Sequence, residues 1–438
     1  MAAALPSLLA AGRARKPLEG MPVLSIDVLT SRRERMRALQ LLCVFAHASV
    51  WGNTEHAHDI IPEGIAVPLS ALAAAEGMPP ILTHNSVILH NWHRLDPSGP
   101  IRTENLAINC QFLGGLDETW FYTATVEIEA RGGGVMGAIL QAHHAIAEAN
   151  SAPNPRNGAA SAAAKTVLEA LAVAKVGIDG MREALSRMPV GCHPLIFYQR
   201  VRPFLSGWKA NPILPDGVVY EGVSSSRQQY YGGSAAQSTL FPALDAALEV
   251  SHAKHSGNAF LLEMRDYMPP AHRRLLEHLS DPARPSIRGF VQSFGSEAPL
   301  SARGNGENGV HKPAGSPENG VDKPAGSPEN GNPGGLGHDD HRSTGGNGSA
   351  AGKATECQVA STADELRDSY NGCLNALRDF RGTHMRIVGS YILQQQKEVQ
   401  KAGDKKSRED FAGGKGTGGT PLLDFLKPLK EDSRDALL

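Results

Sequence analysis

The chain lacks any apolar run of about 18 residues, the length that a membrane-spanning helix requires. It also lacks a basic excess, because 43 lysines and arginines face 45 aspartates and glutamates, for a formal net charge of −2. The first absence argues against a membrane protein, and the second argues against a nucleic-acid-binding protein. What the chain does have is 438 residues, 41% of them hydrophobic, which is enough for a sizeable core.

Cysteine is scarce, and its pattern excludes two common frameworks. The five cysteines are odd in number, widely spaced and free of any CxxC pair: Cys43, Cys110, Cys192, Cys357 and Cys373. A zinc ribbon or a disulfide scaffold is therefore not expected, and a reducing, cytoplasmic location fits best. The basic, acid-free start of the chain, residues 1–16, is weakly similar to an organelle transit peptide. A disordered terminus over residues 1–25 is the favoured interpretation.

Residues 296–361 are poor in apolar side chains, and no aromatic residue occurs between Phe294 and Tyr370. Within this stretch, ENGVHKPAGSP at 307–317 is followed by ENGVDKPAGSP at 318–328. Such a composition cannot bury enough apolar surface to offset its ordering entropy, so we predict disorder. The segment either links two domains or interrupts one. The short tail that follows would make a poor independent core, which favours an insertion in one fold.

Elsewhere the apolar residues recur mainly at helical intervals. Residues 32–50, 162–188 and 238–250 each place their apolar side chains near one face of a helix. The one strand-like stretch is WFYTATVEI at 120–128, which could also be a buried helix. We therefore predict a mainly α fold.

One predicted helix carries a histidine on its apolar face. A capping box at Thr362 and Glu365 predicts the start of this helix. The apolar stripe that follows includes His384: Leu366, Tyr370, Cys373, Leu374, Leu377, Phe380, His384, Ile387, Val388 and Tyr391. An inward imidazole can ligate a haem iron from a dry pocket, with its other nitrogen held by a partner. Periodicity alone favours the alternative, a core histidine.

Four sequence blocks change that balance. They are FYQRVRPFLSGWKANP at 197–212, GGSAAQS at 232–238, YMPPAHR at 267–273, and RGTH at 381–384 followed by KGTGGT at 415–420. A weaker fifth pairs Asn91-Trp92 with Asp96-Pro97. In this order and approximate spacing, from about residue 30 to the C-terminus, they resemble the indoleamine 2,3-dioxygenase family.

The resemblance implies a helical haem dioxygenase fold, with a small N-terminal cap domain at 26–150 and a large all-helical haem domain at 151–438, interrupted by the insert. It implies one haem b per chain, active as Fe(II). It also implies insertion of O2 across the indole C2–C3 bond of L-tryptophan to give N-formylkynurenine. No oligomerisation signal is evident, so a monomer without nucleic-acid or membrane partners is expected.

The resemblance also assigns roles to residues. His384 matches the proximal iron ligand, and Arg202 matches the arginine that binds the substrate carboxylate through a fork of donors. Phe121 and Phe197 match walls of the indole pocket. On the cofactor side it implies Gly233, Ser234, Phe241, Asp245 and Arg381, with Ser234 and Ala235 also near the substrate. Asp245 and Arg381 match a pair that ties the proximal helix to a haem propionate, and Ser234 also suits a helix N-cap.

Thr125 and Thr417 complete the predicted catalytic set. Thr417 lies in a glycine-rich stretch that suggests a mobile lid. Two positions depart from the family pattern, because His84 replaces a pocket tyrosine and Thr125 replaces a distal serine. His84 could line the substrate pocket or donate a hydrogen bond to bound O2.

Two other functions stay open. One is a haem-binding sensor or signalling protein of the same fold with weak or no tryptophan turnover. The other is a helical interaction protein without a cofactor. Retention of Arg202, Phe197 and Thr417 favours the enzyme, because a buried unpaired arginine would be costly in a degenerate pocket.

Overall fold

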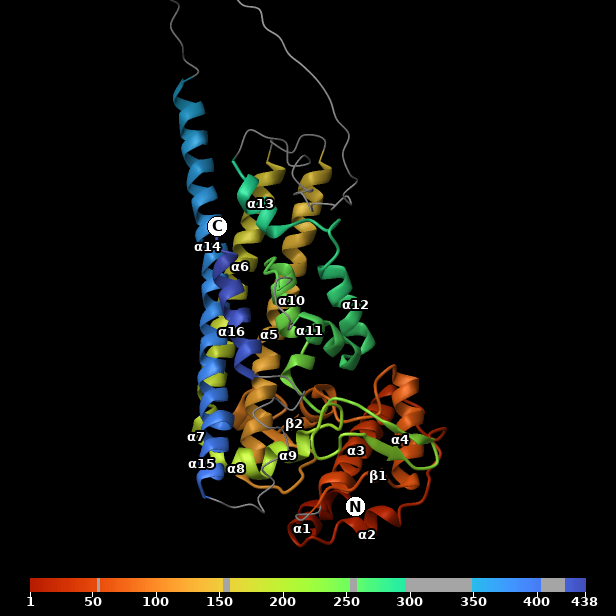
Figure 1. The fold of residues 1–438 in the computed structure, drawn as a ribbon. Helices are drawn as coiled ribbons and strands as arrows, with labels where there is room; N and C mark the ends of the chain where they lie inside the picture. The colour runs from red at the N-terminus through yellow and green to blue at the C-terminus, as the bar shows by residue number, and fades with distance from the viewer. Residues whose placement is uncertain (53–55, 153–157, 253–257, 296–348, 403–421) are drawn as a thin grey trace, which may run out of the picture.

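The computed structural model describes the chain except for residues 53–55, 153–157, 253–257, 296–348 and 403–421 (Figure 1). For residues 349–357, 402 and 422–425 it describes the backbone alone. The fold is mainly α, as predicted, and two small sheets accompany the helices. Among the described residues, every helix is too short or too polar to span a lipid bilayer.

The N-terminal region consists of helices α1 (Leu5–Ala10), α2 (Arg15–Glu19), α3 (Arg32–Trp51) and α4 (Glu63–Glu76). The prediction of a disordered terminus at 1–25 is wrong. Leu5, Leu9 and Leu18 are at most 3% exposed and join the core around α3. Burying a leucine side chain contributes about 1.5–3 kcal/mol, which offsets the entropy of ordering these short helices.

Two small sheets flank these helices. Strand β1 (Ile60–Ile61) pairs in parallel with β4 (Val218–Tyr220), which pairs antiparallel with β5 (Ser224–Gln228). Strand β2 (Trp92–Arg94) pairs antiparallel with β3 (Leu106–Ile108). The first sheet therefore pairs residues 60–61 with residues near 220, and helices α5 and α6 lie between these two segments along the chain.

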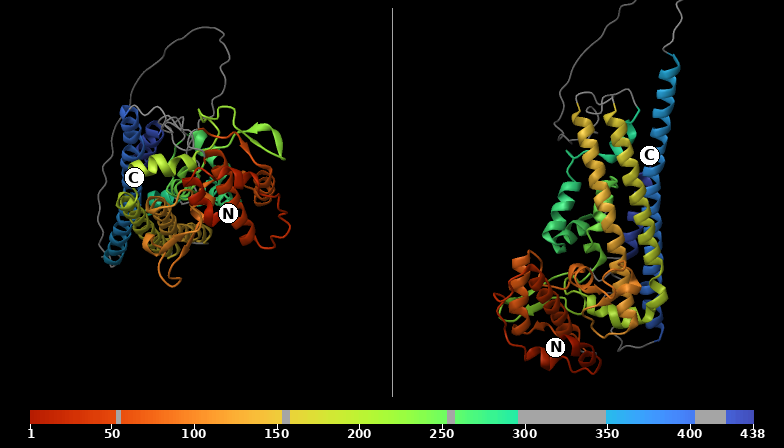
Figure 2. Two further views of the ribbon diagram at one scale, coloured as in Figure 1. Left: turned by 90° about the horizontal axis from the view of Figure 1, so that it is seen from below. Right: turned by 180° about the vertical axis from the view of Figure 1, so that it is seen from behind.

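Three long helices run side by side in the larger part of the molecule: α5 (Leu116–Ser151), α6 (Ala159–Ser186) and α14 (Ser349–Val388) (Figures 1 and 2). The ambiguous stretch 120–128 is part of α5, so its apolar run is a buried helix rather than a strand. His143 of α5 is buried in the bundle at 4% exposure.

Shorter helices surround this bundle. They are α7 (Met188–Gly191), α8 (Pro194–Ile196), α9 (Arg202–Leu205), α10 (Leu240–Ala247), α11 (Asn258–Met264), α12 (Pro270–Leu279), α13 (Ile287–Ser293), α15 (Gln394–Ala402) and α16 (Leu422–Asp435). The 3₁₀ turns are η1 (Ala2–Ala4), η3 (Thr103–Asn105), η5 (Ala235–Gln237) and η6 (Arg265–Tyr267). Three single-turn π-helices are also described: η2 (Asn85–Leu89), η4 (Phe197–Val201) and η8 (Gly389–Leu393).

The predicted start of the His384 helix is also wrong. Helix α14 begins at Ser349, and Thr362 lies inside it, where its hydroxyl donates to the Gln358 carbonyl at 3.0 Å. Residues 349–361 include four alanines together with one lysine, one glutamate and one glutamine, which are all strong helix formers. The predicted disordered insert therefore ends before Ser349, and its residues 296–348 lie outside the described structure.

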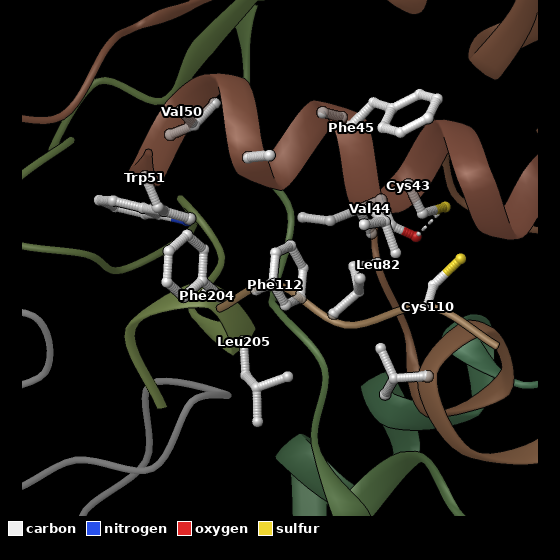
Figure 3. Close-up of a cluster of buried hydrophobic side chains, with 14 of the residues drawn as sticks. Cys43, Val44, Phe45, Val50, Trp51, Leu82, Cys110, Phe112, Phe204 and Leu205 are labelled. Carbon is white, nitrogen blue, oxygen red and sulfur yellow. Dashed lines mark hydrogen bonds between the residues drawn. The ribbon is translucent and has the colours of Figure 1, made fainter. Parts of the chain in front are cut away.

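Buried side chains form two clusters. One gathers α1 to α4 with residues 188–220, and the other gathers the bundle helices with α10, α12 and α13. In the first cluster, Phe112 stacks on Phe204 with ring centroids 4.7 Å apart (Figure 3). Trp51 donates from Nε1 to the Ser206 carbonyl at 2.7 Å. These contacts anchor the backbone directly after Arg202.

The second half of α5 packs in the bundle cluster, as Val135 and Ile139 show. A division into a small N-terminal domain, at 26–150, and a large helical domain, at 151–438, remains our proposal. The structure offers a sharper version in which the small domain ends near the start of α5.

Candidate active site

A cavity of about 460 Å³ lies between the long helices and the N-terminal region. This volume falls within the range of about 300–1,000 Å³ that is usual for small-molecule sites. Each predicted site residue that the structure describes lines it: His84, Phe121, Thr125, Phe197, Arg202, Gly233, Ser234, Ala235, Phe241, Asp245, Arg381 and His384. Thr417 lies outside the described residues.

Helix α14 forms one wall of the cavity. Phe380, Arg381, His384, Ile387 and Val388 face it at intervals of three and four residues. Burial lowers the pKa of His384 to about 4, so its imidazole is neutral and has a lone pair to offer. Neither ring nitrogen hydrogen-bonds to a described residue, so the partner that we expected on its second nitrogen is not found among them.

A second buried histidine shows what a structural imidazole looks like in this protein. Burial also lowers the pKa of His47 to about 4. However, its Nδ1 donates to the Phe204 carbonyl at 2.8 Å, and its Nε2 accepts from the Leu82 amide at 3.3 Å. His47 is thus a satisfied core histidine, whereas His384 lines the cavity and no described residue hydrogen-bonds to its ring nitrogens. The contrast favours an iron ligand over a core histidine at position 384.

A buried chain of charges supports the α14 wall. Arg381 donates from Nη2 to both oxygens of Asp245 at 2.6 Å, and from Nη1 to the Leu429 carbonyl and the Ser433 hydroxyl. Asp245 also contacts Nε2 of His252 at 2.9 Å, while Nδ1 of His252 contacts Asp432 at 2.7 Å. The structure therefore joins α10, α14 and α16 through four ionisable side chains.

The pKa directions in this chain follow from its partners. Burial alone would raise the pKa of Asp245, but the charge of Arg381 and the hydrogen bonds from His252 and Arg381 leave it lowered. Burial alone would lower the pKa of His252, but its hydrogen bonds to Asp245 and Asp432 raise it. Asp245 is therefore ionised at neutral pH. Sequence reasoning missed His252 and Asp432, since neither lies in a recognisable motif.

Helix α5 and helix η4 form an aromatic wall. The rings of Phe121 and Phe197 lie 4.7 Å apart, and Tyr391 of η8 meets Phe197 edge-on at 5.7 Å. Residues of η2, η4 and η8 all line the cavity. Single-turn π-helices are found mostly at functional sites, because they re-aim side chains locally. Here they direct apolar side chains into the cavity from three elements.

Arg202 supplies a buried cation in this wall. It opens α9 and is 3% exposed, with its guanidinium carbon 5.4 Å from the Tyr198 ring centroid. Burial lowers the pKa of Arg202 to about 10, so the side chain remains charged at neutral pH. A buried guanidinium that faces a cavity suits a carboxylate, because its fork of donors matches the two oxygens.

Thr125 offers less than we expected. Its hydroxyl donates to the Phe121 carbonyl, four residues back on α5, at 2.7 Å. The proton of this hydroxyl is thus held by the helix, and only the oxygen lone pairs and the methyl group remain for a ligand.

The glycine-rich segment 232–238 reaches the cavity through a close backbone contact. A Cβ on Gly232 would lie 2.1 Å from the Leu205 carbonyl oxygen, so only glycine fits there. At the neighbouring Gly233 the nearest atom would be a Leu82 methyl at 3.2 Å, which is less restrictive. Ser234 caps η5 as predicted, accepting from the Ala236 amide at 3.2 Å in a capping box with Gln237.

Known proteins were compared with this chain. Its sequence matches the family model described as "Indoleamine 2,3-dioxygenase" over residues 1–304 and 351–436. The chain belongs to the indoleamine 2,3-dioxygenase family. The match breaks off within the predicted insert, which fits an insertion in one fold. Members of this family are haem-dependent dioxygenases, so the protein is an oxidoreductase of this class.

Similar proteins come from animals and from yeast. Indoleamine 2,3-dioxygenase 2 of Mus musculus is 30% identical over 435 residues, covering 99% of this chain and 87% of its own length. Indoleamine 2,3-dioxygenase 1 of Rattus norvegicus is 28% identical, with the same coverage of both chains. Indoleamine 2,3-dioxygenase of Saccharomyces cerevisiae is 29% identical, covering 98% of this chain and 84% of its own.

The cavity fits the cofactor of this family. No group of three or more His, Cys, Asp or Glu side chains is placed to hold a bare metal ion within the described residues. A haem requires only one protein ligand on one face, because the porphyrin supplies the others. His384 is neutral and lines the cavity, and Arg381, which pairs with Asp245, lies one helical turn away on α14. This donor set suits a haem with carboxylate side chains.

Proposed function

We propose that the protein cleaves the indole C2–C3 bond of L-tryptophan with O2, which gives N-formylkynurenine. The observation that carries the proposal is that His384 and Arg202 face one cavity from different walls. A bound haem supplies the iron at which O2 is activated. The protein's own residues bind and orient the substrate, and they keep water from the reacting atoms.

The proposed roles follow from the contacts. His384 holds the iron from α14, and Arg202 binds the substrate carboxylate by a charge-assisted pair of hydrogen bonds. Phe121 and Phe197 enclose the indole, and ring contacts of this kind contribute about 0.5–1.5 kcal/mol each beyond the area they bury. Ser234 and Ala235 contact the substrate, and Gly233 and Phe241 contact the cofactor.

On the cofactor side, we propose that Arg381 faces a haem propionate while Asp245 holds its guanidinium in place. Both Nη atoms of Arg381 donate to described residues, whereas its Nε donates to none of them. Thr125 and Thr417 stay in the proposal as hydroxyl-bearing residues of the substrate side. We also propose one haem b per chain, active as Fe(II), in a cytoplasmic monomer.

The test is product formation by the full chain. The protein is expressed with a haem supply, reduced, and mixed with L-tryptophan and air, and N-formylkynurenine is then measured by chromatography. Product that requires both haem and O2 supports the proposal. Haem uptake without product would indicate a haem-binding sensor instead, and failure to bind haem would overturn the assignment.

Two further measurements address the finer predictions. A pyridine haemochrome spectrum identifies haem b and gives its ratio to protein, and light scattering gives the mass of the particle in solution. A ratio near one per chain and the mass of one chain are expected.

A further inference from the structure

A buried carboxylate on α5 contacts His84 inside the cavity. Oε1 of Glu129 lies 2.9 Å from Nε2 of His84 and accepts a hydrogen bond from the Ser238 hydroxyl at 2.6 Å. The three side chains come from the segment before η2, from α5, and from the glycine-rich segment. All three line the cavity, and none belongs to the charge chain beside His384.

His84 is held at two points. Its side chain is 4% exposed and meets Glu129, while its backbone amide donates to Oε1 of Gln237 at 2.9 Å. Gln237 is fixed in turn, because its Nε2 donates to the Gly232 carbonyl at 2.9 Å. The imidazole therefore has a defined place in the wall rather than a free choice of rotamers.

Glu129 is ionised in this setting. Burial alone would raise its pKa, but the hydrogen bonds from His84 and from the Ser238 hydroxyl leave it lowered. Its side chain is 17% exposed, and no described residue donates to Oε2. An ionised carboxylate accepts hydrogen bonds and donates none. In the hydrogen bond between them, Nε2 of His84 is therefore the donor and carries a proton.

The position of that proton decides what His84 offers to a ligand. A neutral imidazole with its proton on Nε2 carries a lone pair on Nδ1, so Nδ1 is an acceptor. No described residue hydrogen-bonds to Nδ1 of His84. Carboxylates that contact histidines commonly select a tautomer in this way.

The α5 wall changes character along its length. Phe121, Thr125 and Glu129 face the cavity at intervals of four residues, and the ends of this row lie about 12 Å apart along the helix. The row is aromatic at one end and anionic at the other. His84 contacts the anionic end of this row through its hydrogen bond to Glu129.

We propose that Glu129 is a positioning residue which fixes His84 as a hydrogen-bond acceptor for the indole N–H of the substrate. This inference rests on the proposed function, since it adds a contact to the same substrate in the same cavity. In this proposal the protein recognises two groups of the substrate: His84 accepts from the indole N–H, and Arg202 binds the carboxylate. No proton transfer is involved, because the product keeps a hydrogen on this nitrogen.

The probe is a pair of ligands that differ at one atom. L-tryptophan is compared with 3-benzothienyl-L-alanine, in which sulfur replaces the N–H group in an otherwise identical molecule. Equilibrium dissociation constants are measured with the haem-loaded ferric protein by absorbance titration, so turnover does not enter. The quantity of interest is the ratio of the two constants, because a general loss of structure weakens both ligands alike.

The expected ratio in the unaltered protein is about tenfold in favour of L-tryptophan, the size of one buried hydrogen bond and its desolvation. His84→Phe should bring the ratio close to one. Glu129→Gln should reduce it part-way, because a neutral amide accepts more weakly than a carboxylate and no longer enforces one tautomer. Glu129→Gln also serves if the phenylalanine variant does not fold.

One variant on α5 acts as a control. Glu127→Gln removes a buried carboxylate that accepts from Thr103 and Arg131 but does not line the cavity, so the ratio should not change.

Thr125→Val is not a control, because Thr125 lines the cavity; it tests the competing acceptor instead. Both dissociation constants can change in this variant, but the ratio between them should persist if His84 is the acceptor.

Three results would overturn the inference. They are an unaltered ratio in His84→Phe, a ratio lost in Thr125→Val instead, and a ratio of one in the unaltered protein. Failure of the unaltered protein to bind either ligand would instead remove the proposed function, and this inference with it.

Discussion

The two sides of the cavity differ in how their carboxylates are paired. On the α14 side, Asp245 has two cationic partners, Arg381 and His252, and the network continues to Asp432. On the α5 side, Glu129 has one histidine and one hydroxyl, and no described residue donates to its second oxygen. In the first arrangement both carboxylate oxygens of Asp245 are paired, which suits holding a cofactor. The second leaves hydrogen-bonding capacity for a substrate.

The most severe test of this contrast removes the proposed iron ligand on the α14 side. His384→Ala should weaken haem binding by more than about 100-fold, because even the residues that merely support a metal ligand contribute 10–100-fold. Haem content after gel filtration measures the effect. His90→Ala, at an exposed position outside the cavity, is the matched control. Full haem retention in His384→Ala would mean that another residue holds the iron.

The next largest effect concerns the ion pair between Asp245 and Arg381. Asp245→Asn should destabilise the fold by about 3 kcal/mol, because it leaves Arg381 buried beside a neutral amide. Urea unfolding of the haem-free and haem-loaded protein measures the loss. The double variant Asp245→Leu with Arg381→Met replaces the pair by apolar groups and should recover much of it. If the single variant is as stable as the unaltered protein, the pair is not structural.

A change on the other side should leave the fold intact and affect the substrate. Arg202→Leu should raise the dissociation constant of L-tryptophan by about 10- to 100-fold, through the loss of a charged hydrogen bond. Haem content should not change. Arg202→Lys should recover only part of the affinity, because an ammonium group lacks the fork of donors. Loss of haem in either variant would contradict a role confined to substrate binding.

The smallest effect depends on pH and concerns His252, which faces Asp245, Asp432 and, through Asp245, Arg381. Its pKa is raised in the folded protein, so the protonated ring is favoured there. Its contribution, about 1–2 kcal/mol, should be complete below its ordinary pKa of 6.5 and should fade as pH rises through the raised value.

Unfolding of the unaltered protein and of His252→Asn in urea, at several pH values, measures this contribution as a difference. The two proteins should differ most in acid and converge in alkali. A difference that grows toward alkaline pH would contradict the sign of the argument.

Much of this site follows from sequence patterns, and the reason is local geometry. The apolar periodicity of α14 turns His384 inward, and the same helical repeat relates Phe121, Thr125 and Glu129 on α5. Glu129 was in phase with two predicted residues, so this signal was present but unused. The start of α14 was misjudged because a capping box can also occur inside a helix whose preceding residues favour helix.

What the amino-acid sequence determines by itself is the helical fold, the family and the inward direction of His384, because these depend on periodicity and on linear motifs. Only the tertiary structure decides which charges meet. His252 and Asp432 lie 180 residues apart, and His84 meets Glu129 across 45. Such pairs depend on how α5, α10, α14 and α16 pack. That arrangement comes from the summed burial of many apolar side chains, and no single pattern along the chain encodes it.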